Sequence, residues 1–222
     1  MSGLLEKLAK AVEFGKINKN SVFPPELKGQ DGADELTKQA LDSGISPQEV
    51  LNKSLVIGME RIGRKFSENK VFVPQMLMSA KAMGEAMKHI KPYFQSGQVK
   101  RKGTFIIGTV EGDLHDIGKN LVSMMVEGAG WEVVDLGTDV RSGKFNETAA
   151  KYTGCVVGMS ALLTTTMINM EKTVKELKGN FRGIKIAIGG APVTHDFCGK
   201  IGADFYSSDP QGLAEYLHTI SS

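Results

Sequence analysis

The sequence predicts an α/β protein in which an N-terminal four-helix bundle precedes a five-stranded parallel sheet covered by helices. Two patterns predict this fold class. Through residues 1–98 the apolar side chains recur every three or four positions, which is the period of an amphipathic helix. After residue 102, short apolar runs alternate with amphipathic stretches, which is typical of a parallel sheet. The polar, basic stretch at 95–102 indicates a linker, so we expect domains at 1–98 and 99–222.

The composition limits the classes of function. The chain has 222 residues, of which 41% are hydrophobic and 23% are charged, as in an ordinary globular protein. The net charge of +2 comes from basic residues scattered among acidic ones, which argues against nucleic acid as a partner. The N-terminus lacks the features of a signal peptide, and no apolar run is long enough to span a membrane. We therefore expect a cytoplasmic protein with neither a nucleic-acid nor a membrane partner.

The first two predicted helices are bounded by residues that interrupt helices. Apolar residues repeat at helical spacing through 4–12, and the paired prolines at 24 and 25 exclude a helix from the stretch before them. A second helix is predicted over 31–41, where Ser43 and Gly44 close it. The connection between these two helices is long, and its role is not evident from the residues.

The third predicted helix begins at a capping box. Ser46 and Glu49 have the spacing for reciprocal hydrogen bonds with the first turn, and Pro47 suits the first helical position. Apolar residues continue to Phe66 at intervals that drift between three and four. We expect this apolar face to pack against the neighbouring helices.

The fourth predicted helix covers 74–90, and the Lys91-Pro92 pair is expected to end it. Methionines recur along it at positions 76, 78, 83 and 87. Such a stripe is more often core filler than a binding surface. Four helices joined by short loops predict a small bundle.

The second part of the chain alternates between strands and helices. Strands are predicted at 103–110, 132–136, 154–159, 184–188 and 203–206. Helices are predicted between them at 117–129, 140–151, 165–177 and 211–219. Because the strands are nearly continuous apolar runs, both faces of the sheet should be covered. Cys155, Cys198 and Trp131 are expected to be packing residues, the cysteines in reduced form.

The stretch at 111–120 contains the strongest functional signal. It connects the first predicted strand to a helix, and such loops lie where α/β sheets bind ligands. His115 is a potential metal ligand, and Asp113 is close enough to accept a hydrogen bond from its other ring nitrogen. Gly118 would let a large flat ligand approach the backbone. Taken alone, a histidine in a polar loop is more often solvated than a ligand.

Two further pieces follow in order, after later strands. Ser160 and Leu162 form a Ser-x-Leu unit, and Gly189-Gly190 forms a glycine pair. With the Asp-x-His-x-x-Gly unit of the first loop, this ordered set resembles the signature of cobalamin-binding domains. These domains occur in cobalamin-dependent methionine synthase and in the corrinoid proteins of methyltransferase systems. The resemblance implies a Rossmann-like order of the sheet and a helical cap formed by the N-terminal bundle.

The resemblance also implies roles for the residues of the first loop. His115 would replace the cofactor's own base as the lower axial ligand of cobalt. Asp113 and Ser160 would complete a hydrogen-bonded relay with this histidine. For Ser160, capping of the following helix is an alternative role that is compatible with the relay.

The nucleotide tail of the cofactor would run into a cleft of this domain, and Gly118 would let it pass. The residues implied to contact the cofactor here are Asp116, Leu162, Thr164, Thr165 with the adjacent Thr166, Gly189 and Gly190. For the glycines taken alone, an ordinary tight turn after a strand is the alternative. Asp116 and Lys119 are expected to be solvated or to lie at the rim of the cleft.

In the resembling proteins the cap covers the reactive face of the corrin. Phe72 is the residue of this chain that matches the covering position, and Met76 is a second candidate. An apolar lid would exclude water from a strongly reducing cobalt centre. The segment at 14–28 is longer than the family pattern leads us to expect, so it could alter the edge of the lid or a partner contact.

The resemblance covers nearly the whole chain and implies a stand-alone methyl carrier. Its cofactor would be cobalamin or a related corrinoid that cycles between methylcobalamin and cob(I)alamin. One partner would be a methyltransferase specific for a methoxyaromatic, methylamine, methanol or betaine-type donor. The other partners would be a methyltransferase acting on tetrahydrofolate or a thiol, and a reductive activator. The protein would have little activity alone.

Two alternatives remain open at the level of sequence. A cobalamin-dependent sensor or photoreceptor can combine a helical cap with the same motif, and it would favour adenosylcobalamin and respond to light. A cobalamin-binding mutase subunit shares the Asp-x-His-x-x-Gly unit but lacks such a cap. In that case, removal of residues 1–98 would leave the reactivity of the cofactor unchanged.

Overall fold

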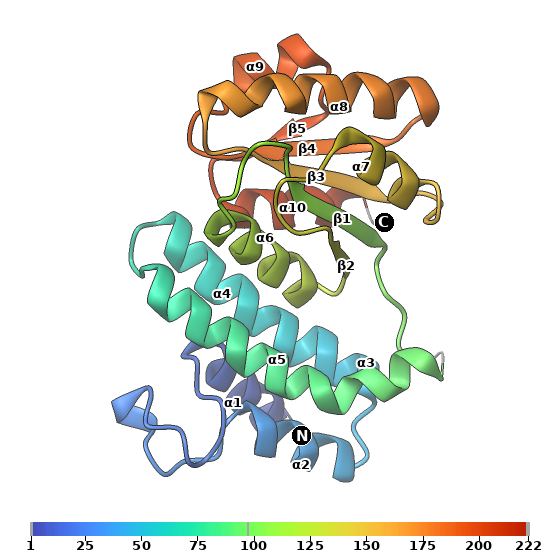
Figure 1. Cartoon of the computed structure of the whole chain (residues 1–222). Helices are drawn as coiled ribbons and strands as arrows, with labels where there is room; N and C mark the ends of the chain where they lie inside the picture. Colours follow the sequence, from blue (N-terminus) through green and yellow to red (C-terminus); the bar gives the residue numbers. More distant parts are fainter. Residues whose placement is uncertain (1, 97, 221–222) are drawn as a thin grey trace. The chain divides into compact units, whose positions relative to one another are not determined.

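The computed structural model describes residues 2–96 and 98–220, and the chain divides into two compact units (Figure 1). The first unit contains residues 1–101 and 128–130, and the second contains 102–127 and 131–222. The first is helical and the second is built on a sheet, as the predicted fold class requires. Among the described residues, no helix is long and apolar enough to cross a membrane.

Helices at all four predicted places form the N-terminal unit. They are α1 (Ser2–Glu13), α2 (Ala33–Asp42), a continuous helix made of α3 (Pro47–Val50), a π-helical turn (Leu51–Leu55) and α4 (Val56–Ser67), and α5 (Val73–Gln95). The Ser46 hydroxyl accepts a hydrogen bond from the Glu49 N–H at 3.2 Å, as expected of the N-cap. A π-helical turn adds one residue to a helical turn, which accounts for the drifting apolar spacing along this segment.

Helix α5 continues past the position where the sequence was expected to end it. Pro92 lies inside the last turns of α5, which extends to Gln95. A proline lacks the N–H that would bond to the carbonyl four residues earlier, but its fixed φ is compatible with a helix. The helix continues through Pro92, whose carbonyl accepts from the Ser96 N–H at 3.3 Å.

The long connection between α1 and α2 is ordered by its own hydrogen bonds. A short 3₁₀ turn (Pro25–Leu27) lies within it. The Lys16 side chain is fully buried, and its Nζ donates to the Ser21 carbonyl at 2.8 Å. The Lys16 carbonyl in turn accepts from the Ala33 N–H at 2.9 Å, which ties the loop to the start of α2. The extra length therefore forms a defined substructure.

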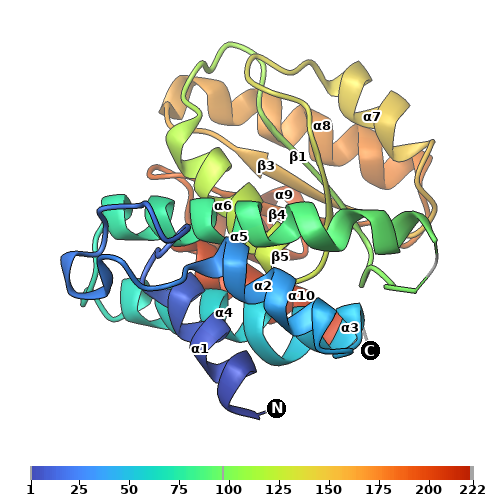
Figure 2. The same cartoon turned by 90° about the horizontal axis from the view of Figure 1, so that it is seen from below.

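The second unit contains a parallel sheet in the order β2-β1-β3-β4-β5. The strands are β1 (Thr104–Thr109), β2 (Glu132–Asp135), β3 (Val156–Ser160), β4 (Lys185–Gly189) and β5 (Phe205–Tyr206). Its helices are α6 (Ile117–Gly128), α7 (Ser142–Ala149), α8 (Met167–Asn180), α9 (His195–Ile201) and α10 (Pro210–Ile220). Figures 1 and 2 show that α7, α8 and α9 cover one face of the sheet, and that α6 and α10 cover the other.

The alternation of side chains along the strands explains the two covered faces. Ile106 and Val157 belong to the core cluster that includes residues of α7, α8 and α9. Their neighbours Phe105 and Gly158 lie one position along and therefore face the opposite side. Trp131 is buried beside Gly103, in agreement with its predicted packing role.

One helix of the second unit was absent from the expected elements. Helix α9 is short, which leaves little periodic signal in the sequence. The Thr194 hydroxyl caps it by accepting from the Phe197 N–H at 3.2 Å, and Gly202 ends it with a φ of 76°. Cys198 is buried on this helix and Cys155 precedes β3, and both are reduced.

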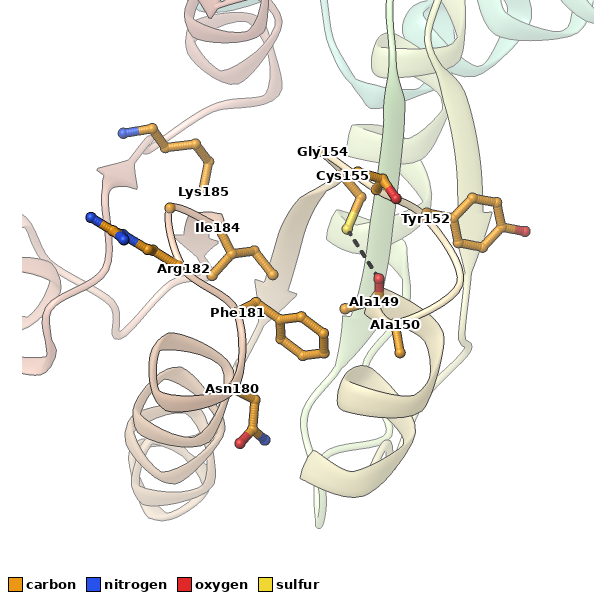
Figure 3. A pocket seen from close by; sticks show the side chains of 12 residues that line it. Ala149, Ala150, Tyr152, Gly154, Cys155, Asn180, Phe181, Arg182, Ile184 and Lys185 are labelled. Carbon is orange, nitrogen blue, oxygen red and sulfur yellow. Dashed lines mark hydrogen bonds between the residues drawn. The ribbon is translucent and has the colours of Figure 1, made fainter.

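A cavity of about 370 Å³ opens at the amino ends of β3 and β4 (Figure 3). Phe181 and Ile184, from the loop between α8 and β4, face Ala149 and Ala150 at the end of α7. The Cys155 thiol lies 4.0 Å from the Ala149 carbonyl oxygen. This cavity lies at the edge of the sheet opposite the carboxyl ends of the strands.

The order of the strands creates a switch point beside β1. Chain connections leave β1 toward β2 on one side and arrive at β3 on its other side. The loops after β1 and β3 therefore separate at their carboxyl ends, which is where open α/β sheets bind ligands. The Asp-x-His loop and the Ser-x-Leu loop flank this point.

Replacement of Gly158 by alanine is expected to destabilise the second unit by about 1–3 kcal/mol because it overpacks the core. The added Cβ would lie 2.3 Å from the Cζ atom of the fully buried Phe105 ring. Urea unfolding followed by the fluorescence of Trp131, the single tryptophan, would measure this change.

Gly179→Ala is the matched control. Gly179 lies in α8, and a Cβ there would meet nothing within 4 Å. This variant should be neutral or more stable by up to about 1 kcal/mol, since alanine is the better helix former. Equal losses in both variants would contradict the predicted packing of Gly158 against Phe105.

Candidate functional site

The loop after β1 pairs a buried carboxylate with a half-exposed imidazole. Asp113 is fully buried, whereas the His115 side chain is 52% exposed. Asp113 Oδ1 lies 2.7 Å from His115 Nδ1 and accepts the His115 main-chain N–H at 3.1 Å. An ionised carboxylate can only accept, so Nδ1 carries the ring proton. In the neutral imidazole the other ring nitrogen, Nε2, is then the one that can act as a ligand.

The second oxygen of Asp113 is held by the loop after β3. Asp113 Oδ2 accepts the N–H groups of Leu162 at 2.7 Å and Leu163 at 3.1 Å, and it lies 3.0 Å from Thr166 Oγ1. Burial alone would raise the pKa of Asp113, but the hydrogen bonds from His115, Leu162 and Thr166 outweigh it. The pKa of Asp113 therefore lies well below its usual range, and the carboxylate is ionised at neutral pH.

Among the residues that the structure describes, Ser160 forms no hydrogen bond with Asp113 or His115, in contrast to the prediction. Thr166 is the hydroxyl residue on Asp113, and Ser160 contributes its main-chain carbonyl to the Val110 N–H at 3.0 Å. Asp113 lies beyond the end of β3, where residues after the strand can reach it. Thr164 and Thr165 are exposed, whereas Thr166 is buried. The threonine run before α8 was the available signal, but it did not single out Thr166.

Two other side chains hold the backbone of the Asp-x-His loop. The fully buried Thr109, at the end of β1, donates its hydroxyl to the His115 carbonyl at 2.8 Å. Asn169, in the first turn of α8, donates its side-chain amide to the Glu111 carbonyl at 2.8 Å. The loop is thus fixed both by its own strand and by the helix that follows β3.

Lys119 is buried, in contrast to its predicted position in solvent or at a cleft rim. It is 3% exposed, and its Nζ contacts the Asp135 carboxylate and the Asn120 side-chain oxygen, the latter at 2.6 Å. A lysine can be buried when a carboxylate neutralises it, and Asp135 supplies that partner from the end of β2. Asp116 is exposed and accepts a hydrogen bond from the Asn120 amide at 3.0 Å.

The three glycines of the motif differ in what the fold demands of them. Gly190 has a φ of 126°, and a Cβ there would lie 1.9 Å from the Ala161 carbonyl oxygen, so the fold requires glycine. Gly118 has no such φ, and a Cβ there would meet nothing within 4 Å. At Gly189 the nearest atom would be at an ordinary 3.5 Å. Backbone conformation and packing therefore leave Gly118 and Gly189 without an intramolecular reason to be glycine.

Exposed aliphatic side chains gather on the elements that carry the pair. Large exposed aliphatic residues of the second unit are Leu114, Ile117, Leu162, Leu163 and Ile168. They belong to the Asp-x-His loop, the first turn of α6, the loop after β3 and the first turn of α8. These side chains are available for contact with an apolar ligand or partner.

The two residues predicted from the helical unit have opposite environments. Phe72 precedes α5 and is 69% exposed, so its ring is available for contact. Met76 is buried on the same face of α5 as Ser79, whose hydroxyl donates to the Glu13 carbonyl of α1 at 2.8 Å. Met76 is therefore packed as core filler, whereas its contact with a cofactor stays a prediction.

Residues 2–96 and 98–220 contain no group of three or more His, Cys, Asp or Glu side chains arranged to hold a metal ion. His115 by itself offers one nitrogen. The arrangement suits a metal that arrives with its other ligands attached.

Known proteins resemble this chain along most of its length. A family model described as "B12 binding domain" matches residues 103–212, and a second one with the same description matches residues 30–91. The trimethylamine corrinoid protein of Methanosarcina barkeri is 44% identical over 178 residues, which are 78% of this chain and 82% of that protein. Trimethylamine corrinoid protein 2 of Methanosarcina mazei is 42% identical over 212 residues, covering 93% of this chain and 92% of that protein.

Solved structures show the same fold. The methanol:cobalamin methyltransferase complex MtaBC from Methanosarcina barkeri matches with a TM-score of 0.81 and 29% identity, over 99% of this chain and 80% of that one. A cobalamin-binding protein from Desulfitobacterium hafniense matches with a TM-score of 0.74 and 28% identity, over 97% of both chains.

The depressed pKa of Asp113 predicts a specific acid sensitivity. Because the folded-state pKa lies below the unfolded value of about 3.9, the ionised carboxylate stabilises the fold above that value. This contribution is lost as the pH falls below about 4. The stabilities of the wild type and Asp113→Asn in urea should therefore differ most near neutral pH, and the difference should shrink as the pH falls from about 4 to 2. Parallel stability curves would contradict the assignment.

The position of Thr166 predicts different effects of two hydroxyl deletions. Thr166→Val should lower the free energy of unfolding by about 1.5–3 kcal/mol, because the hydroxyl bonds to a buried charged group. Ser160→Ala should change it by less than about 0.5 kcal/mol. Thr166→Ser keeps the hydroxyl and should recover most of the loss. Thermal unfolding would distinguish these variants. Equal losses of stability in Thr166→Val and Ser160→Ala would support a hydrogen bond from Ser160 to Asp113.

Proposed function

Because this chain belongs to the family of corrinoid proteins with B12 binding domains, we propose that it carries a methyl group on a bound corrinoid between two methyltransferases. The observation that carries the proposal is the Asp113–His115 pair at the switch point of the sheet. In its neutral form the imidazole presents Nε2 as a potential ligand, on a loop that also carries exposed aliphatic side chains.

The residues present fit a corrinoid. A corrinoid would bring most of the ligands of its cobalt with it, so a single protein nitrogen such as His115 Nε2 would be sufficient to hold the metal. The broad apolar edge of the ring matches the exposed Leu114, Ile117, Leu162 and Leu163. The open space beside Gly118 matches a ligand that passes close to the backbone.

Asp113 prepares His115 for ligation. Its carboxylate keeps the proton on Nδ1, fixes the orientation of the ring and raises the basicity of Nε2. Thr166 and the N–H groups of Leu162 and Leu163 keep that carboxylate ionised and immobile.

A bound corrinoid would supply a cobalt centre that accepts a methyl group from one methyltransferase and yields it to another. The chain's own part is to bind, orient and shield. The exposed aliphatic residues would exclude water from the lower side of the ring. Phe72 is the residue of the helical unit that we propose for shielding the reactive side.

We assign the methyl donor to the methylamine class. The support is the identity of 40–44% to relatives named trimethylamine or dimethylamine corrinoid proteins. The first partner is then a methyltransferase specific for a methylamine. The second partner transfers the methyl group to a thiol or tetrahydrofolate, and a reductive activator restores the reduced cobalt.

Electron paramagnetic resonance tests the ligation. Protein reconstituted with cob(II)alamin would be prepared with natural-abundance histidine and with nitrogen-15 histidine. The unpaired electron of cobalt(II) points along the axial bond, so a histidine ligand should change the nitrogen splitting from a triplet to a doublet on labelling. His115→Ala should remove this splitting.

His195→Ala is the matched control, because His195 is an exposed histidine of the same unit, in the first turn of α9. It should keep the labelled splitting. A splitting that ignores the label, or that survives His115→Ala, would reject His115 as the ligand.

The donor class has a separate test. The reduced holoprotein would be mixed with a purified trimethylamine, dimethylamine or methanol methyltransferase and its substrate, and methylation would be followed by the absorbance of the corrinoid. Methylation with a methylamine enzyme is expected. Methylation only with the methanol enzyme would move the chain to another donor class while leaving the carrier function intact.

A further inference from the structure

The loop after β2 holds the Asp-x-His loop through one strained residue. Asp139 has a φ of 55°, in the left-handed region that few residues other than glycine adopt. Its main-chain N–H donates to the Asp113 carbonyl at 3.0 Å, and its Oδ1 accepts the Gly112 N–H at 2.7 Å. Asp139 thus forms hydrogen bonds with Gly112 and Asp113, the two residues that precede Leu114.

This loop is itself anchored to the end of β1. The Thr109 N–H donates to the Gly137 carbonyl at 2.9 Å, and the Val140 N–H donates to the Thr109 carbonyl at 2.9 Å. The same Thr109 donates its hydroxyl to the His115 carbonyl. The residues on either side of Asp139 therefore share with His115 a single rigid anchor in the sheet.

Core packing does not account for the conformation of Asp139, because its side chain is exposed. A left-handed backbone is unfavourable for a non-glycine residue, and it persists where surrounding contacts impose it. The contacts that hold Asp139 are its two hydrogen bonds to Gly112 and Asp113. An aspartate suits both requirements, since it tolerates this conformation and offers a charged acceptor.

We propose that Asp139 is a positioning residue for His115, acting through the main chain of Gly112 and Asp113. The inference rests on the proposed function for its purpose, which is to orient the axial ligand. The geometry itself belongs to the cofactor-free protein. Loss of the Asp139 carboxylate would let Gly112 and Asp113 shift. The contact between Asp113 Oδ1 and His115 Nδ1 would then no longer select one tautomer of the His115 ring.

Three variants at this position distinguish the effect of losing the carboxylate from the effect of an unfavourable backbone conformation. Asp139→Ala removes the acceptor and penalises the left-handed conformation. Asp139→Gly removes the acceptor but allows the conformation. Asp139→Asn keeps an acceptor oxygen and tolerates the conformation, so it should behave as the wild type does.

Two nuclear magnetic resonance measurements on the cofactor-free protein provide the test. The Gly112 amide should exchange with solvent at least about tenfold faster in the Ala and Gly variants, because its bond to a charged acceptor is lost. The ring nitrogens of His115 should show one tautomer, protonated at Nδ1, in the wild type and in Asp139→Asn. In the Ala and Gly variants they should show averaged shifts of two tautomers.

Asn69→Ala is the control for strain alone. Asn69 has a φ of 57° in the helical unit, so alanine there carries the same backbone penalty without touching the Asp-x-His loop. The His115 ring should be unchanged in this variant. A single Nδ1 tautomer retained in Asp139→Ala and Asp139→Gly would overturn the proposal, as would its loss in Asp139→Asn.

The outcome is independent of the carrier function. All of these signals come from protein without a corrinoid, whereas ligation to cobalt is measured by electron paramagnetic resonance on reconstituted protein. If the Ala and Gly variants lose the single Nδ1 tautomer but His115 does not bind cobalt in the reconstituted protein, the proposed function is rejected and the positioning role stands. If His115 binds cobalt but the Ala and Gly variants keep the single Nδ1 tautomer, the positioning role is rejected and the proposed function stands.

Discussion

The second unit depends on the burial of one charged group, the carboxylate of Asp113. A carboxylate with no exposed surface is costly unless hydrogen bonds replace the lost water, and this one receives them from two separate loops. Those bonds join the loop after β1 to the loop after β3 across the switch point of the sheet. The electrostatic requirement of a single residue thus determines how the two loops approach each other, and the orientation of His115 follows from it.

The surrounding residues divide into those that support the loop and those that remain available to a ligand. Thr109, Thr166, Asn169 and the buried Lys119–Asp135 pair use their polar atoms within the protein. The exposed aliphatic side chains, the free imidazole nitrogen and the space beside Gly118 have no partner of that kind among the described residues. This division explains how a rigid polar framework can present an apolar surface with one basic nitrogen. Such a surface suits a metal-containing macrocycle, which brings its own chemistry and requires only orientation and shielding.

Much of the fold could be predicted because its signals are local. Helical periodicity, the Ser46 N-cap and the apolar strands depend on neighbours within a few residues, and the structure confirms them. The failures have equally physical causes. Pro92 was expected to stop α5, but its fixed φ is compatible with a helix, and α5 continues to Gln95. Helix α9 is too short to leave a periodic pattern, although Thr194 and Gly202 mark its ends.

The sequence by itself determined the fold class and the ordered motif, because these follow from residue types and their spacing. Only the tertiary structure decided which side chains complete the site. The Thr166 hydroxyl, and not that of Ser160, bonds to Asp113. Met76 is buried, and Lys119 pairs with the Asp135 carboxylate at the end of β2. Each of these outcomes depends on where a distant segment of the chain comes to lie. A hydrogen bond or an ion pair forms between atoms that are close in space, and spacing along the chain does not reveal that closeness when the partners belong to different strands and loops.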